Sequence, residues 1–128
     1  MASREEVTQA IFEICRDELP GINWQLNIIG AQRSSQVEGS ISCTDMDFES
    51  ISKGLVQANA NYEIYIIDMQ GKSDIDGMGD LLFEKLNDNN LGGLVFSCRV
   101  VRMAYGAAKE FSAWAVKLEL QVAYNMYY

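Results

Sequence analysis

The chain has 128 residues, of which 48% are hydrophobic and 22% are charged, a composition that suits one domain over residues 1–128 with a single core. Ten basic residues against eighteen acidic ones give a net charge of −8, which argues against a protein that grips DNA or RNA phosphates. Histidine is absent, which excludes Ser-His-Asp and Cys-His catalysis and removes the commonest transition-metal ligand. No stretch approaches the roughly 20 apolar residues of a membrane span, and the charged start is unlike a secretory signal, so we expect a cytoplasmic protein.

The first predicted element is a helix that begins after Ser3. Ser3 and Glu6 form the S-x-x-E pattern of a capping box, and proline and glycine at residues 19–21 end the helix. Apolar residues recur between them at helical spacing. They are Val7, Ala10, Ile11, Ile14 and Cys15.

Two strands are predicted next, over residues 22–28 and 37–43, because apolar and polar residues alternate in both segments. A polar loop at residues 31–35 separates them. Residues 44–57 follow no clear period, and we expect an exposed excursion between strands with Gly54 as its turn. Asp45, Asp47 and Glu49 would share one side of this segment if it were extended.

A long strand over residues 58–67 and a second helix come next. The strand is apolar on both faces in its second half, which is typical of a covered centre of a sheet. Ser73, with Asp76 three residues on, predicts the N-terminus of the helix, after a loop at residues 68–72. Residues 87–90 end the helix, and Gly92-Gly93 turns the chain. The apolar face of the helix holds Ile75, Met78, Leu82 and Leu86, with Leu81 and Phe83 beside it.

Two strands close the chain, over residues 94–101 and 114–125, joined by a connection at residues 105–110. The last strand has the strongest alternation, with Trp114, Val116, Leu118, Leu120, Val122 and Tyr124 on one face. The order of elements predicts an α+β fold, with a mostly antiparallel sheet of about five strands and both helices packed on one face.

No motif in the sequence predicts catalysis, a cofactor or a metal. Cys15, Cys43 and Cys98 are widely spaced without C-x-x-C, so we interpret them as buried small hydrophobic residues. Ser50-Ile51-Ser52-Lys53 matches S-x-x-K in letters but lies in the irregular acidic segment. A calcium loop counted from Asp74 fails because it would place a methionine and a lysine at ligand positions.

Carboxylate chemistry stays open as an alternative because acids are plentiful. Asp45 with Glu49, or Asp68 with Asp80, could meet in space and support a small hydrolase. A ligand-binding module is the remaining alternative from another class.

Tyrosines gather at the edges and ends of the predicted strands. The last five residues are rich in them, and tyrosine and methionine are enriched at protein interfaces. They could also complete the rim of the domain's own core. We interpret four residues as a subunit or tube interface: Tyr124, Met126, Tyr127 and Tyr128.

The order of these elements resembles the tail terminator, or tail completion, proteins of tailed bacteriophages and of phage-like tail particles. The resemblance covers nearly the whole chain: a first helix ending in Leu-Pro-Gly, a strand with Trp24, the segment NYEIYIID at residues 61–68, the segment VVRMAYG at residues 100–106 and a long closing strand. Other head–tail joining and minor tail proteins share much of this layout.

The resemblance implies a structural subunit that is not an enzyme and carries no cofactor or metal. Such subunits form a ring, usually a hexamer, that caps the tail tube, stops its polymerisation and joins it to the head connector. They assemble in the host cytoplasm and remain in the virion tail, and DNA passes their acidic lumen without specific binding. The resemblance therefore implies that Asp45, Asp47 and Glu49 face the DNA path.

Overall fold

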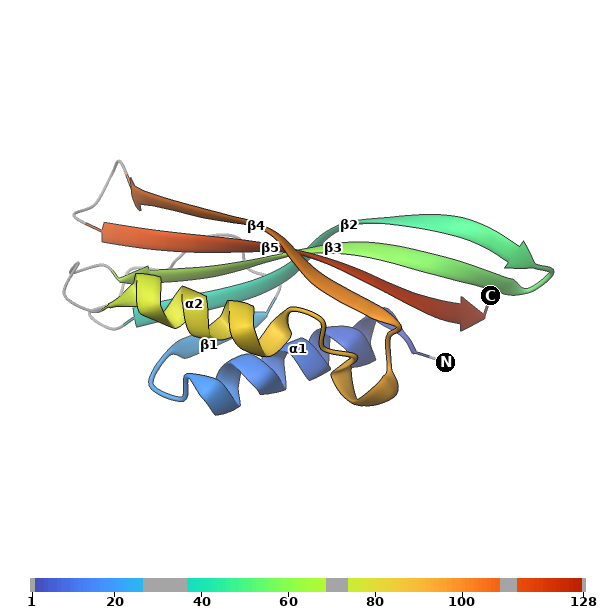
Figure 1. Ribbon diagram of the computed structural model, residues 1–128, viewed down its shortest axis with the longest axis horizontal. Helices are drawn as coiled ribbons and strands as arrows, with labels where there is room; N and C mark the ends of the chain where they lie inside the picture. The colour runs from blue at the N-terminus through green and yellow to red at the C-terminus, as the bar shows by residue number, and fades with distance from the viewer. Residues whose placement is uncertain (1, 27–36, 69–73, 109–112, 128) are drawn as a thin grey trace.

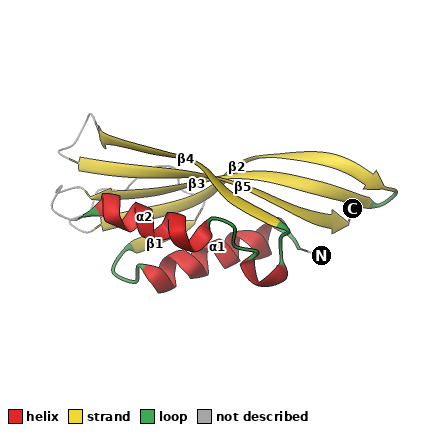
Figure 2. Ribbon diagram, viewed as in Figure 1, coloured by secondary structure: helices red, strands yellow, loops and turns green. Residues whose placement is uncertain are grey.

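The computed structural model describes residues 2–26, 37–68, 74–108 and 113–127, and it has the α+β fold that the sequence predicts. Within these described ranges, five strands form one sheet in the order β1-β2-β3-β5-β4, in which only β1 and β2 are paired in parallel. Both helices cover one face of this sheet (Figures 1 and 2). The elements are α1 (Arg4–Glu18), β1 (Asn23–Leu26), β2 (Val37–Ser52), β3 (Leu55–Asp68), α2 (Ile75–Leu86), a short 3-10 turn (Leu91–Gly93), β4 (Ser97–Ala108) and β5 (Ala113–Tyr127).

Helix α1 begins with the predicted capping box. The Ser3 hydroxyl accepts a hydrogen bond from the Glu6 backbone N–H at 3.2 Å, and the Glu6 carboxylate accepts one from the Ser3 N–H at 3.1 Å. The helix ends at Glu18, before Pro20, and its buried positions include the predicted Val7, Ile11 and Cys15.

Helix α2 begins one residue later than the sequence suggested. Its N-terminal cap is Asp74, whose carboxylate accepts a hydrogen bond from the Gly77 N–H at 3.0 Å, so the assignment of the cap to Ser73 is wrong. Ser73 itself lies outside the described residues. An aspartate directly before the first helical residue is as good a cap as serine, and sequence spacing alone did not separate the two.

The expected irregular excursion at residues 44–57 is the largest error of the sequence analysis. Strand β2 runs on to Ser52, the chain turns at Gly54 with a φ of 81°, and β3 begins at Leu55. Register shifts between Cys43 and Asp45 and between Ser50 and Ser52 interrupt the alternation, which is why the segment lacked a clear period. Gly54 is the turn, as predicted.

Strand β4 is also longer and later than predicted. It starts at Ser97 and reaches Ala108, so residues 105–108 extend the strand that they were expected to follow. A register shift between Val100 and Arg102 moves the side-chain alternation by one place and hid this continuation. Before the strand, Val95 is buried, whereas Phe96 is 58% exposed.

The core lies between the helices and the inner face of the sheet. One face of β3 and β5 supplies most of it, as the alternation predicted, although Trp114 is partly exposed at its margin. Cys15 and Cys98 are buried as expected, but Cys43 is only half-buried near the open part of β2. No helix in the described ranges is long and apolar enough to cross a membrane. The central buried side chains of the sheet are Ala58, Ala60, Tyr62, Ile64, Ile66, Val116, Leu118, Leu120, Val122 and Tyr124.

Candidate assembly surface

The end of the sheet that carries the β2–β3 turn projects beyond the helices and forms an arm (Figure 1). The arm consists of residues 44–58 of the β2–β3 hairpin and residues 123–127 of β5, which pair in register from Ala58 with Tyr124 to Leu55 with Tyr127. Both ends of the chain lie toward the same end of the molecule as the arm (Figure 1). A three-stranded extension of this kind leaves backbone edges open, so it is the part of the fold most exposed to a partner.

Exposed apolar side chains mark the arm. Phe48 is 55% exposed, Ile51 50% and Tyr127 68%. Phe48 shares the helix side of the sheet with Ala58 and Tyr124, whereas Tyr127 lies on the opposite side beside Leu55. The arm therefore offers apolar contacts on both of its faces, as expected of an element that inserts into an assembly.

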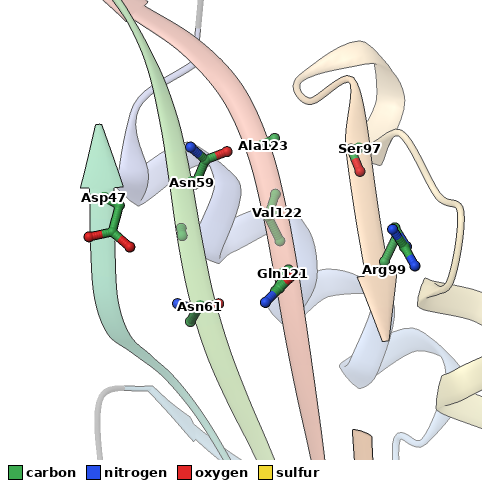
Figure 3. A pocket seen from close by; sticks show the side chains of 9 residues that line it. Asp47, Asn59, Asn61, Ser97, Arg99, Gln121, Val122 and Ala123 are labelled. Atoms are coloured by element: carbon green, nitrogen blue, oxygen red, sulfur yellow. The ribbon is translucent and has the colours of Figure 1, made fainter. Parts of the chain in front are cut away.

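The face of the sheet turned away from the helices, termed the outer face, is mostly polar from the arm to the β4 edge, apart from Leu55 and Tyr127 at the tip of the arm. Asp47 of the β2 edge lies at one side, amide side chains lie in the middle, and Arg99 lies at the β4 edge (Figure 3). Several of these residues line an open hollow across four strands. From β2 to β4 the outer face holds Asp45, Asp47, Glu49, Gln57, Asn59, Asn61, Gln121, Ala123, Asn125, Ser97 and Arg99.

The three acids singled out in the sequence do share this face, and all three are exposed. The Asn61 amide donates a hydrogen bond to Asp45 at 2.6 Å, which holds that carboxylate in place. Within the described residues, Asp47 and Glu49 have no hydrogen bond or ion pair, so their charges face solvent. Whether they line a DNA path is a question of assembly and stays a prediction.

Farther from the arm, the outer face carries a charge network that the sequence analysis missed. The Lys117 ammonium lies 3.7 Å from Glu119 and 3.9 Å from Glu63, and Arg102 lies 3.7 Å from Glu119. These side chains are partly exposed, so each pair contributes little to stability. The network joins residues more than fifty positions apart in the chain, and only the strand register brings them together.

The predicted aromatic interface is only partly placed at the surface. Tyr124 is fully buried in the chain's own core, so its assignment to an interface is wrong; it faces the same side as Leu120 and Val122. Met126 is half-buried against the core, and Tyr127 is exposed. Tyr128 lies outside the described residues.

The two carboxylate pairs considered for catalysis differ in how the structure places them. Asp45 and Glu49 are four residues apart on one strand, about 13 Å at the usual rise, which exceeds the spacing of paired glycosidase carboxylates. Asp68 is buried at the end of β3, whereas Asp80 is exposed on α2. In the ranges that the structure describes, no three acids or cysteines come together in a way that could hold a metal ion.

Comparison with known proteins finds solved structures with a similar fold but no matching family. No family model matches the chain, and no curated protein matches it. A chain of the virion of a native gene transfer agent particle has a similar fold, with a TM-score of 0.69 and 10% sequence identity over 94% of this chain and 95% of the other. A second solved protein, whose name states no function, gives a TM-score of 0.56 and 15% identity over 100% and 99% of the two chains. The fold is therefore shared with a chain of a gene transfer agent virion over 95% of the length of that chain.

Proposed function

We propose that this chain is a non-catalytic structural subunit of a phage-like particle, and specifically a tail terminator that forms a ring on the end of the tail tube. The fold likeness to a chain of a gene transfer agent virion, which spans nearly all of both chains, carries this proposal. The projecting arm, with exposed apolar groups on both faces, supports it, because a solitary domain gains nothing from exposing such groups.

In this proposal the outer face of the sheet turns toward the lumen of the ring. A lumen that DNA crosses must not bind the phosphates of the DNA backbone. Three exposed acids repel these phosphates, and the neutral amides beside them do not attract them. The arm, with Phe48 and Tyr127, reaches the tube protein or a neighbouring subunit, and the opposite end of the ring meets the head connector. The hexameric number follows from the family resemblance alone.

A second candidate function is that of another head–tail joining or minor tail protein. It is supported by the same fold likeness and differs from the terminator role in the protein that the chain would bind. We test the two together by light scattering after size-exclusion chromatography, with the chain alone and mixed with the tube protein of its own particle. A terminator is expected to form a ring and to stop tube growth when added to polymerising tube protein. A joining protein would assemble without stopping the tube, and a chain that stays monomeric in every mixture contradicts both roles.

A further inference from the structure

We propose that the ring closes edge to edge: the β4 edge of one copy lies along the arm part of the β2 edge of the next copy, with Arg99 and Arg102 beside Asp45, Asp47 and Glu49. This inference rests on the proposed function, because it names the interface between the subunits of that ring. The partner is a second copy of this chain.

Both strands have an open edge where the proposal needs one. Within the described residues, β1 pairs with β2 only from Glu38 to Ile41, so the arm part of β2 has a strand neighbour on one side only, β3. In the part of the chain that the structure describes, β4 is the last strand of the sheet and pairs only with β5. Open edges present unpaired backbone N–H and C=O groups that favour pairing with another chain.

The strand directions suit a sheet that continues from copy to copy. β2 is antiparallel to β3, β3 to β5 and β5 to β4, so β4 runs opposite to β2. Copies placed side by side in the same orientation therefore set β4 of one antiparallel to β2 of the next. Antiparallel pairing needs no further element between the strands.

The charges on the two edges are opposite and lie on the same face. The acids of β2 project from the outer face, and so do Arg99 and Arg102 of β4, on either side of the register shift. Arg99 has no ion pair within the described residues, and Arg102 has one long contact to Glu119 at 3.7 Å. Two β2 edges would bring acids together and two β4 edges would bring arginines together, so like charges disfavour self-pairing of either edge.

An interface between two different edges is heterologous and closes into a ring when the rotation fits. Because β1 occupies the β2 edge from Glu38 to Ile41, the next copy has to dock displaced toward the arm. A displacement along the strands at each junction is what a closed ring of tilted strands requires. The pairing also removes arginine charge from a lumen that DNA crosses.

Charge reversal tests this interface. Variant A carries Arg99→Glu and Arg102→Glu, and variant B carries Asp45→Lys, Asp47→Lys and Glu49→Lys. We expect each alone to lose ring formation by light scattering, at least ten-fold in the concentration needed, and an equimolar mixture to recover it. The control reverses two exposed cations of the helices, Arg16→Glu and Lys85→Glu, and is expected to assemble as the unmodified chain does.

Circular dichroism melts establish that each variant is folded, and Arg99→Glu alone is the fallback if loss of the Arg102–Glu119 contact unfolds variant A. Rings formed by variant A or B alone would overturn the edge pairing while leaving the terminator role intact. So would a mixture that fails to assemble, or one that stops at a closed dimer. An unmodified chain that never associates, even with tube protein, overturns the proposed function and the interface together.

Discussion

At the scale of single residues, two buried tyrosines differ in the hydrogen bonding of their hydroxyl groups. The Tyr62 hydroxyl lies 2.7 Å from the Thr8 hydroxyl, which itself donates to the Arg4 carbonyl at 2.8 Å. With the Thr8 proton committed to that carbonyl, Tyr62 is the donor in the first bond. The Tyr124 hydroxyl is buried without a hydrogen-bond partner in the part of the chain that the structure describes.

Replacing each tyrosine with phenylalanine should therefore act in opposite directions. Tyr62→Phe removes a satisfied bond and is expected to lower the free energy of unfolding by about 1 kcal/mol. Tyr124→Phe removes a polar group without a partner, so it should leave that free energy unchanged or raise it by a similar amount. Urea titrations of the two variants beside the unmodified chain measure both effects, and an equal loss in both would contradict the assignment of the bonds.

The buried cysteine thiols and a buried tyrosine phenol predict that the free energy of unfolding falls at high pH. Burial raises the pKa of the Cys98 thiol to about 11, with Asp88 adding in the same direction. Burial also raises the pKa of the Cys15 thiol and of the Tyr62 phenol. These groups ionise earlier in the unfolded chain, so their contribution is complete below a pH of about 8.5 and is lost as the pH rises toward the folded values. Urea melts at pH 8 and pH 10 are expected to give a lower unfolding free energy at pH 10, with a smaller drop in Cys98→Ala.

At the scale of elements, regular alternation was predictable and its interruptions were not. β5 keeps a period of two along its length, and its inward face was identified from sequence. β2 and β4 each contain a register shift, and there the pattern broke and the strand was cut short. A bulge changes which face a side chain occupies without any residue type that marks it, so a single sequence gives little warning.

The centre of β5 should be the least tolerant part of the fold. Leu118 is fully buried between Ile64 and Met103 on neighbouring strands. Leu118→Ala is expected to lower the free energy of unfolding by roughly 2–5 kcal/mol, a large share of the ~5–15 kcal/mol of such a domain. Gln121→Ala, exposed on the outer face of the same strand, is the control and should change it by less than about 0.5 kcal/mol. Similar losses in both would place the core elsewhere.

The arm should serve assembly rather than folding. Phe48 and Tyr127 are more than half exposed, so Phe48→Ser and Tyr127→Ser together are expected to leave the melting temperature of the subunit nearly unchanged. The same pair should weaken ring formation or tail completion, because it removes apolar contact on both faces of the arm. Phe83→Ser, at an exposed position on α2, is the matched control. A double variant that fails to fold would assign these side chains to the core.

For the whole molecule, the order of elements predicted the α+β class of fold, whereas the positions of the surface charges became known only from the structure. The net charge of −8 does not tell where on the surface the acidic and basic side chains lie. The pairing of β2, β3, β5 and β4 sets Asp45 and Arg99 at opposite edges of one face, although they lie far apart in the chain. For Tyr124 two signals in the sequence conflicted: the alternation put it on the apolar face of the last strand, whereas its place near the chain end suggested an interface, and the structure shows it buried.

The last prediction concerns where the negative charge lies. Neutralising the arm acids by Asp45→Asn, Asp47→Asn and Glu49→Gln should change subunit stability little, because exposed acids contribute little and, among the described residues, only Asp45 of the three makes a hydrogen bond. Because the same acids face Arg99 and Arg102 in the proposed ring interface, rings of this variant are assembled at a raised subunit concentration. If the outer face lines the DNA path, these rings should retain DNA nonspecifically at about 50 mM salt and release it at about 200 mM, as a contact governed by counterions does. The control removes the same charge from the helix side by Glu5→Gln, Glu13→Gln and Glu84→Gln, all at exposed positions. Because both variants have the same net charge, only position separates them, and filter binding of labelled DNA to the two rings measures the difference. Equal retention by both would mean that net charge alone acts, and the outer face would then not be the lumen.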